Sequence, residues 1–63
     1  DRREVQEEMQ QLERRIDMKK KELREARSAK NSASHIAYVE KDLRDLNIEM
    51  LQLRFKFAQM PQP

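Results

Sequence analysis

The side chains that could carry chemistry are carboxylates, basic groups and a single histidine, His35. The 12 Asp and Glu residues could act as acids, bases or metal ligands, but we expect them on outward positions of a rod-shaped fold without an enclosed pocket. Catalysis needs a concave site that limits water and perturbs its groups. His35 has no cysteine and no second histidine with which to share a metal. We therefore expect no enzyme activity, no catalytic residue, no metal and no cofactor, with His35 at the surface.

A basic region in the first half of the chain could attract RNA, DNA or an acidic membrane. It consists of Arg14, Arg15, Lys19, Lys20, Lys21, Arg24, Arg27 and Lys30. Acidic residues are interleaved with it, so residues 1–30 carry a net charge of only +2, and this half has no aromatic side chain on which a base could stack. A leucine-zipper DNA reader needs a basic helix free of acids. These features argue against a nucleic-acid or membrane partner.

Composition excludes several further classes. The chain has 63 residues, so it is too short for two domains. Its net charge is +2. It has no Cys and no Gly, which excludes a disulfide framework and a glycine loop that binds phosphate. We expect no small-molecule substrate. No apolar run has the length of a membrane span and no signal peptide opens the chain, so a cytoplasmic location is expected. The chain starts within its repeat pattern without a cap signature, which suggests a segment of a longer protein.

Apolar residues in the second half follow a heptad repeat. Their spacings alternate between 3 and 4 residues without a fault, as in the seam of a coiled coil. The predicted core positions are Ile36, Val39, Leu43, Leu46, Met50, Leu53, Phe57 and Met60. Pro61 and Pro63 stop this helix.

The first half carries a second seam that is less regular. Its core positions are Val5, Met9, Leu12, Ile16, Lys19, Leu23 and Ala26. Lys19 is the polar exception. Either its stem packs while its ammonium reaches water, or it serves to fix the register or the oligomeric state.

The two seams differ in phase by one residue, which is about 100° of rotation on a helix. The slip falls in Ser28–Ser34, which is rich in Ser and poor in large apolar residues. These residue types favour turns and helix caps. We expect Asn31 to adopt the left-handed conformation, and Ser32 or Ser34 to cap the second helix.

An antiparallel hairpin that turns near Asn31 pairs the two seams apolar to apolar at every position except Lys19. Charges beside the seam agree with this register: Glu8–Lys56, Arg15–Glu49 and Lys20–Glu40 attract. Glu22 and Asp42 repel each other, and Lys19 lies between them, where its positive charge relieves the repulsion. A straight helix in an antiparallel homodimer makes the same contacts between two chains and is the alternative.

The second helix also has an apolar stripe outside the seam, formed by Ile48, Leu51 and Phe55. We call these three residues the outer stripe. A clustered apolar patch on an outward face usually marks a contact surface. We interpret the outer stripe as partner-binding, either to another copy of the chain or to a different protein.

The hairpin layout, with Leu12–Leu23 followed by Val39–Leu53, is similar to the antiparallel coiled-coil fingers with which Rho-effector proteins bind small GTPases. The glycine-containing stretch near the end of that family's first helix is absent, and Lys21–Ala26 stands in its place. The resemblance implies a monomeric hairpin that binds a regulatory protein such as a small GTPase.

The sequence thus predicts an all-α fold, a two-helix antiparallel coiled-coil hairpin, in a single module of residues 1–60. Helix one covers about 2–28, the connection about 29–34 and helix two about 35–60, before a Pro-containing tail at 61–63. The expected function is protein–protein interaction or oligomerisation within a larger intracellular scaffold, cytoskeletal or trafficking protein.

Overall fold

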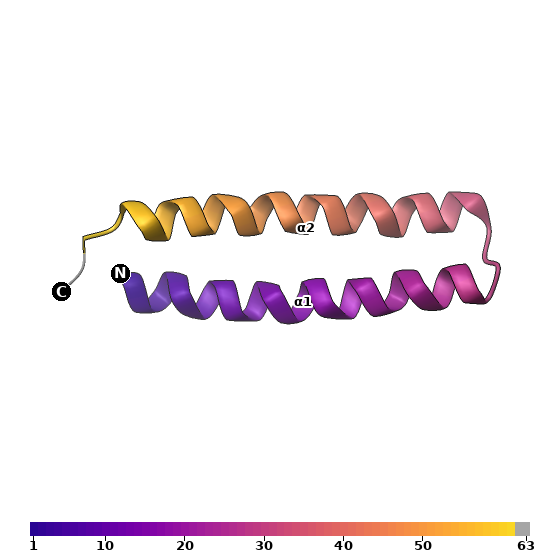
Figure 1. The fold of residues 1–63 in the computed structure, drawn as a ribbon, viewed down its shortest axis with the longest axis horizontal. Helices are drawn as coiled ribbons and strands as arrows, with labels where there is room; N and C mark the ends of the chain where they lie inside the picture. Colours follow the sequence, from indigo (N-terminus) through magenta and orange to yellow (C-terminus); the bar gives the residue numbers. More distant parts are fainter. Residues whose placement is uncertain (62–63) are drawn as a thin grey trace.

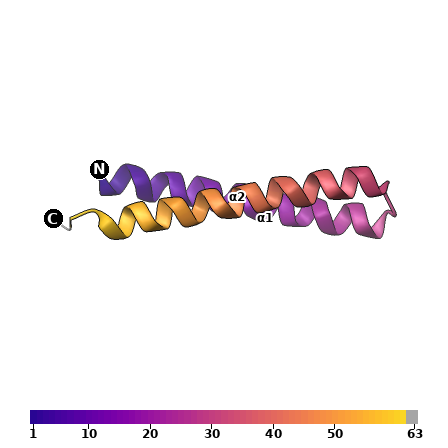
Figure 2. The same ribbon diagram turned by 90° about the horizontal axis from the view of Figure 1, so that it is seen from above.

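A computed structural model describes residues 1–61 of the chain. The chain is an all-α antiparallel hairpin in which α1 spans Arg2–Ser28 and α2 spans Ala33–Gln59 (Figure 1). The Cα trace of the rod extends over 49 × 14 × 11 Å. Figure 2 shows that α2 crosses α1 near the middle of the rod and that both chain ends lie at the same end. The predicted hairpin is therefore the fold, and the chain reverses instead of continuing as a straight helix. Residues 62 and 63 of the predicted tail lie outside the described residues.

The apolar core lies along the seam between the two helices. Its centre is a cluster of Leu12, Ile16, Leu46 and Met50, and Val39 is completely buried, with 0% of its surface exposed. Every residue of the two predicted seams is at least partly buried. The buried ones are Val5, Leu12, Ile16, Leu23, Ala26, Val39, Leu46 and Met50, and the half-buried ones are Met9, Lys19, Ile36, Leu43, Leu53, Phe57 and Met60.

Helix α1 ends in a hydrogen-bonded reversal known as a Schellman motif. The backbone N–H of Asn31 donates to the Ala26 carbonyl at 3.0 Å, and that of Lys30 donates to the Arg27 carbonyl at 3.2 Å. Lys30 has a φ of 54° and is the left-handed residue, so the prediction for Asn31 was wrong. The reason is the bonding pattern: the left-handed residue precedes the one whose amide reaches back to Ala26.

Both helices begin at a side-chain cap. Ser32 Oγ accepts from the backbone N–H of His35 at 3.2 Å, so α2 starts at Ala33, two residues earlier than expected. Asp1 Oδ1 accepts from the backbone N–H of Glu4 at 3.0 Å. The expectation that the chain opens without a cap was therefore wrong, because an Asp followed three residues later by Glu is itself a capping pattern.

Helix α2 ends at Gln59 because proline follows closely. Met60 is extended, with φ −78° and ψ 139°, as expected for a residue that precedes Pro61. The Arg2 guanidinium covers this end from α1. Its Nη1 donates to the carbonyl oxygens of Phe57 and Met60 at 3.1 and 3.0 Å. These bonds close the open end of the hairpin, where the backbone carbonyls at the end of a helix lack their usual intrahelical partners. The Phe57 carbonyl also accepts from the backbone N–H of Met60 at 3.2 Å.

Candidate interaction surface

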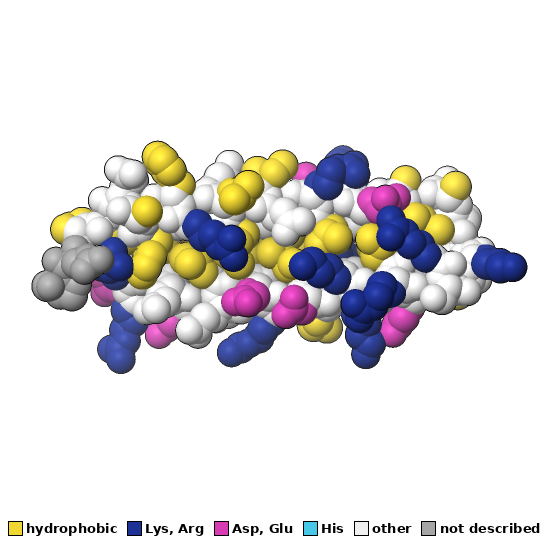
Figure 3. Space-filling model, in the orientation of Figure 1, with side chains coloured by type: hydrophobic (Ala, Val, Ile, Leu, Met, Phe, Trp, Pro, Cys, Tyr) yellow, Lys and Arg dark blue, Asp and Glu magenta, His cyan; other side chains and the backbone are white. Residues whose placement is uncertain are grey.

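The outer stripe lies on the side of α2 that faces away from α1. Ile48 is 54% exposed, Leu51 63% and Phe55 69%. Spacings of 3 and 4 residues keep the three side chains on one face, and the heptad phase of α2 directs that face outward. Figure 3 shows hydrophobic side chains along the outer margin of α2 as well as along the seam. Helix α2 is therefore apolar on two faces, and only the inner one is covered by this chain.

Polar side chains border the outer stripe along its whole length. Asp45 and Gln52 flank it on one side, together with Lys56, and Asn47 and Arg54 flank it on the other. All five are exposed. The stripe is thus a narrow apolar face with a mixed polar rim, the arrangement that protein–protein contact surfaces commonly have.

A groove borders the outer stripe on the side of Arg54. It has a volume of about 430 Å³ and is lined by Leu51 together with Ile16 and Met50 of the core. Its other lining residues are polar: Glu13, Asp17, Lys20, Asn47 and Arg54. This groove extends the apolar surface from the stripe toward the seam.

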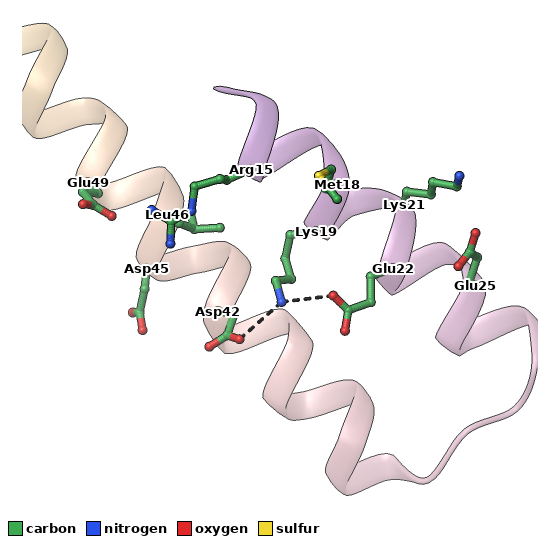
Figure 4. Close-up of a pocket in the computed structure, with 10 residues that line it drawn as sticks. All are labelled: Arg15, Met18, Lys19, Lys21, Glu22, Glu25, Asp42, Asp45, Leu46 and Glu49. Atoms are coloured by element: carbon green, nitrogen blue, oxygen red, sulfur yellow. Dashed lines mark hydrogen bonds and ion pairs between the residues drawn. The ribbon is translucent and has the colours of Figure 1, made fainter. Parts of the chain in front are cut away.

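A larger groove of about 780 Å³ runs along the opposite side of the hairpin (Figure 4). Lys19 lies at its centre, where its Nζ is 3.0 Å from Glu22 Oε2 and 3.5 Å from Asp42 Oδ2. As predicted, the ammonium separates two carboxylates that would otherwise repel each other across the seam. Its side chain is 23% exposed, so the stem packs while the ammonium stays at the edge of the groove.

These contacts favour the charged form of Lys19. The hydrogen bond to Glu22 raises the pKa of Lys19 above its ordinary value of 10.5, and the charges of Glu22 and Asp42 raise it further. Partial burial acts in the opposite direction. The net effect is a raised pKa, so the ammonium of Lys19 stays charged and links α1 to α2.

The other cross-helix charge pairs differ from the predicted ones. Glu40 pairs with Arg27 and not with Lys20. The distance from Arg27 Nη2 to Glu40 Oε2 is 3.1 Å. Within residues 1–61, Glu8–Lys56 and Arg15–Glu49 do not form ion pairs either. Exposed long side chains gain little from pairing, so local reach decides which partner they take.

The remaining chemical groups lie apart from one another. His35 is exposed in the first turn of α2. In the part of the chain that the structure describes, no three His, Asp or Glu side chains come together as metal ligands. Two members of the basic region, Lys19 and Arg27, are engaged with carboxylates. Neither α1 nor α2 is long and apolar enough to cross a membrane.

Two residues that contribute to these surfaces and contacts were not predicted from the sequence. Met18 is 72% exposed on α1 and lines the larger groove. Its heptad position next to Lys19 is a signal from which this location could have been predicted. Arg2 has no such signal, because its contacts with Phe57 and Met60 span more than 50 positions of sequence.

Comparison of the chain with protein-family models, curated proteins and solved structures finds no match in any of the three.

Proposed function

We propose that this hairpin is a protein–protein interaction and oligomerisation module within a larger cytoplasmic scaffold, cytoskeletal or trafficking protein. The observation that supports the proposal is the exposed outer stripe of Ile48, Leu51 and Phe55, each more than half exposed. The seam is filled by residues of this chain, so folding of the hairpin does not require the stripe. Its three large apolar side chains are available for contact with another surface.

The energetics support this use of the stripe. Full burial of a Leu, Ile or Phe side chain stabilises by about 1.5–3 kcal/mol relative to exposure. Since more than half of each stripe residue is exposed, its burial on association can recover about 1 kcal/mol or more for each residue. In our proposal the two seams supply folding through coiled-coil packing, and the stripe supplies assembly.

Sedimentation equilibrium from micromolar to millimolar concentration tests this function. We expect the wild-type chain to associate and a variant with Leu51→Gln and Phe55→Gln to remain monomeric. Helicity by circular dichroism should be the same in both, because neither position belongs to the buried seam. Tyr38→Gln is the matched control, since Tyr38 is 64% exposed but lies off the stripe. Association that persists unchanged in the Leu51 and Phe55 variant would contradict the proposal.

The second candidate function is recognition of a regulatory protein, such as a small GTPase, by a monomeric hairpin. One observation favours it: the seam is closed within one chain, with Val39 fully buried and no second copy needed. A chain that stays helical and monomeric at millimolar concentration would favour this candidate over self-association.

A further inference from the structure

The rim of the outer stripe carries opposite charges at its two ends. If a second copy of the stripe ran in the opposite direction, each charge would face one of opposite sign. Asp45 and Lys56 are 11 residues apart, which is close to three helical turns, so they lie on the same side of the stripe. Along one helix they are separated by about 16 Å, too far to pair within the chain. Within the described residues 1–61, neither takes part in an ion pair. Each therefore has its charge free for a partner.

We propose that the occupant of the outer stripe is a second copy of this chain, packed with its α2 antiparallel to the first α2 about a two-fold axis. This inference rests on the proposed function and specifies the partner and its orientation. The register is the one in which the numbers of facing residues add to about 103. It brings Ile48 against Phe55 of the second copy, and the two Leu51 side chains together near the axis.

The same register matches the rim. In an antiparallel pair about a two-fold axis, residues on one side of the stripe face the same side of the other copy. Asp45 then faces Lys56 of the second copy, and symmetry makes this pair twice. The two Gln52 amides meet near the axis, and Arg54 lies opposite Asn47 of the second copy. No residues of like charge face each other directly.

The arrangement also closes on itself. A two-fold contact uses the same patch on both partners, so the stripe is consumed when two hairpins have joined. The result is a four-helix assembly in which each α2 is covered on one face by its own α1 and on the other by the second α2. A helix that is apolar on two faces is then buried on both, as its pattern requires.

Distances between spin labels test the orientation. The chain has no Cys, so Ala37→Cys and Lys41→Cys each provide a unique attachment site on an exposed position of α2. Both positions lie outside the proposed overlap or at its edge. In the antiparallel register we expect pulsed electron paramagnetic resonance to give about 44 Å for position 37 and about 32 Å for position 41. In a parallel dimer the helix axes would be about 10 Å apart, so the labels would lie close together at both positions. That result would overturn the proposal.

A charge swap tests the register. Asp45→Lys alone, or Lys56→Asp alone, replaces two attractive pairs with two repulsive ones, and we expect each to weaken the dimer about tenfold. The double variant restores opposite charges and should return the dimer to within about threefold of wild type. Because the two positions cannot meet within one chain, such a rescue can arise only between chains. Additive weakening in the double variant would overturn the register.

The outcomes separate this proposal from the function on which it rests. A wild-type chain that is monomeric at all concentrations would overturn both self-association and the second copy, and would leave a different protein as the occupant. Association that is abolished by Leu51→Gln and Phe55→Gln, combined with short label distances or a failed rescue, would overturn only the antiparallel geometry.

Discussion

The backbone of Lys30 is held in a conformation that suits glycine better than lysine. Its φ of 54° places Cβ close to the following carbonyl, at a cost of about 1–2 kcal/mol for a residue other than glycine. The chain tolerates this cost because the reversal satisfies the carbonyls of Ala26 and Arg27 near the end of α1 and allows α2 to return along the seam. In a chain without any glycine, this is the position where one would help most.

We predict that Lys30→Gly stabilises the hairpin. Removing the left-handed strain, less the added entropy of glycine in the unfolded chain, should raise the free energy of unfolding by about 0.5–1 kcal/mol. Thermal denaturation followed by circular dichroism measures the change. Asn31→Gly is the control, because Asn31 has no positive φ and should gain nothing. Equal stabilisation by the two substitutions would show that the left-handed backbone of Lys30 is not the cause.

Lys19 shows how a polar residue can occupy an apolar seam. Its ammonium bridges Glu22 of its own helix and Asp42 of the other, so the group that breaks the heptad also joins the two helices. Any other alignment of α1 with α2 would separate Lys19 from Asp42. The contact therefore favours one alignment of α1 with α2.

The raised pKa of Lys19 makes a prediction about alkaline pH. Because the pKa is higher in the folded chain than its ordinary value of 10.5, the stabilisation is fully present below pH 10.5 and is lost as the pH rises through the folded-state pKa. Lys19→Met keeps the stem but removes the charge. We expect the difference in unfolding free energy between wild type and Lys19→Met to be constant from pH 7 to 9 and to move against the wild type above pH 10.5.

Urea denaturation at a series of pH values measures this difference. Lys20→Met serves as the control, because Lys20 is exposed and makes no ion pair within residues 1–61. Its difference from wild type should show a smaller dependence on pH. If Lys19→Met and Lys20→Met have the same pH profile, the bridge to Glu22 and Asp42 does not stabilise the fold.

At the scale of the helices, the two ends of the hairpin are held by different means. The turn end is held by the covalent connection and by the pair of Arg27 with Glu40. The open end has no connection and depends on Arg2. Its guanidinium lies 3.9 Å from the centre of the Phe57 ring and donates to the carbonyls of Phe57 and Met60. A positive charge at the C-terminal end of a helix also interacts favourably with the helix dipole.

We predict that Arg2→Ala frays the open end. Losing two hydrogen bonds and the contact with the Phe57 ring should lower the free energy of unfolding by about 1–2 kcal/mol. Hydrogen exchange should accelerate at the amides of the last turn of α2 and remain unchanged near the turn. Arg3→Ala is the matched control, since Arg3 is exposed on the same turn of α1. Uniform acceleration along α2 would instead indicate a global loss of stability.

At the scale of the whole molecule, the hairpin is a thin rod with most of its residues in contact with solvent. The Cα trace spans 49 Å along the rod but only 14 and 11 Å across it, so a single row of seam residues has to supply the core. A domain of about 60 residues buries a smaller fraction of its surface than a larger one and is marginally stable. Burial of the outer stripe in an assembly would add a second apolar layer beside the first.

This geometry predicts that stability depends on concentration. If the stripe mediates self-association, the melting temperature should rise by about 3–5 °C for each tenfold increase in chain concentration. The variant with Leu51→Gln and Phe55→Gln should melt at one temperature throughout. Differential scanning calorimetry over two decades of concentration makes the comparison. A wild-type melting temperature that does not vary with concentration would count against self-association.

Much of the fold could be predicted from residue spacing. The 3.5-residue repeat through Val39 and Leu46, the loss of phase near Ser32 and the stop at Pro61 predict two helices joined by a turn. These features are local, because the chemistry of a residue and its place in a helical repeat decide which face it occupies. The exposure of Leu51 and Phe55 follows from the same periodicity.

Other features were decided only when the two helices came together. Which residue takes the left-handed backbone depends on the hydrogen bonds that close α1, and these select Lys30 instead of Asn31. Glu40 pairs with Arg27 because that side chain reaches it across the hairpin, and Arg2 covers the end of α2 from the far end of the sequence. Periodicity determines the faces of each helix, whereas contacts between distant segments depend on distances that only the packed hairpin establishes.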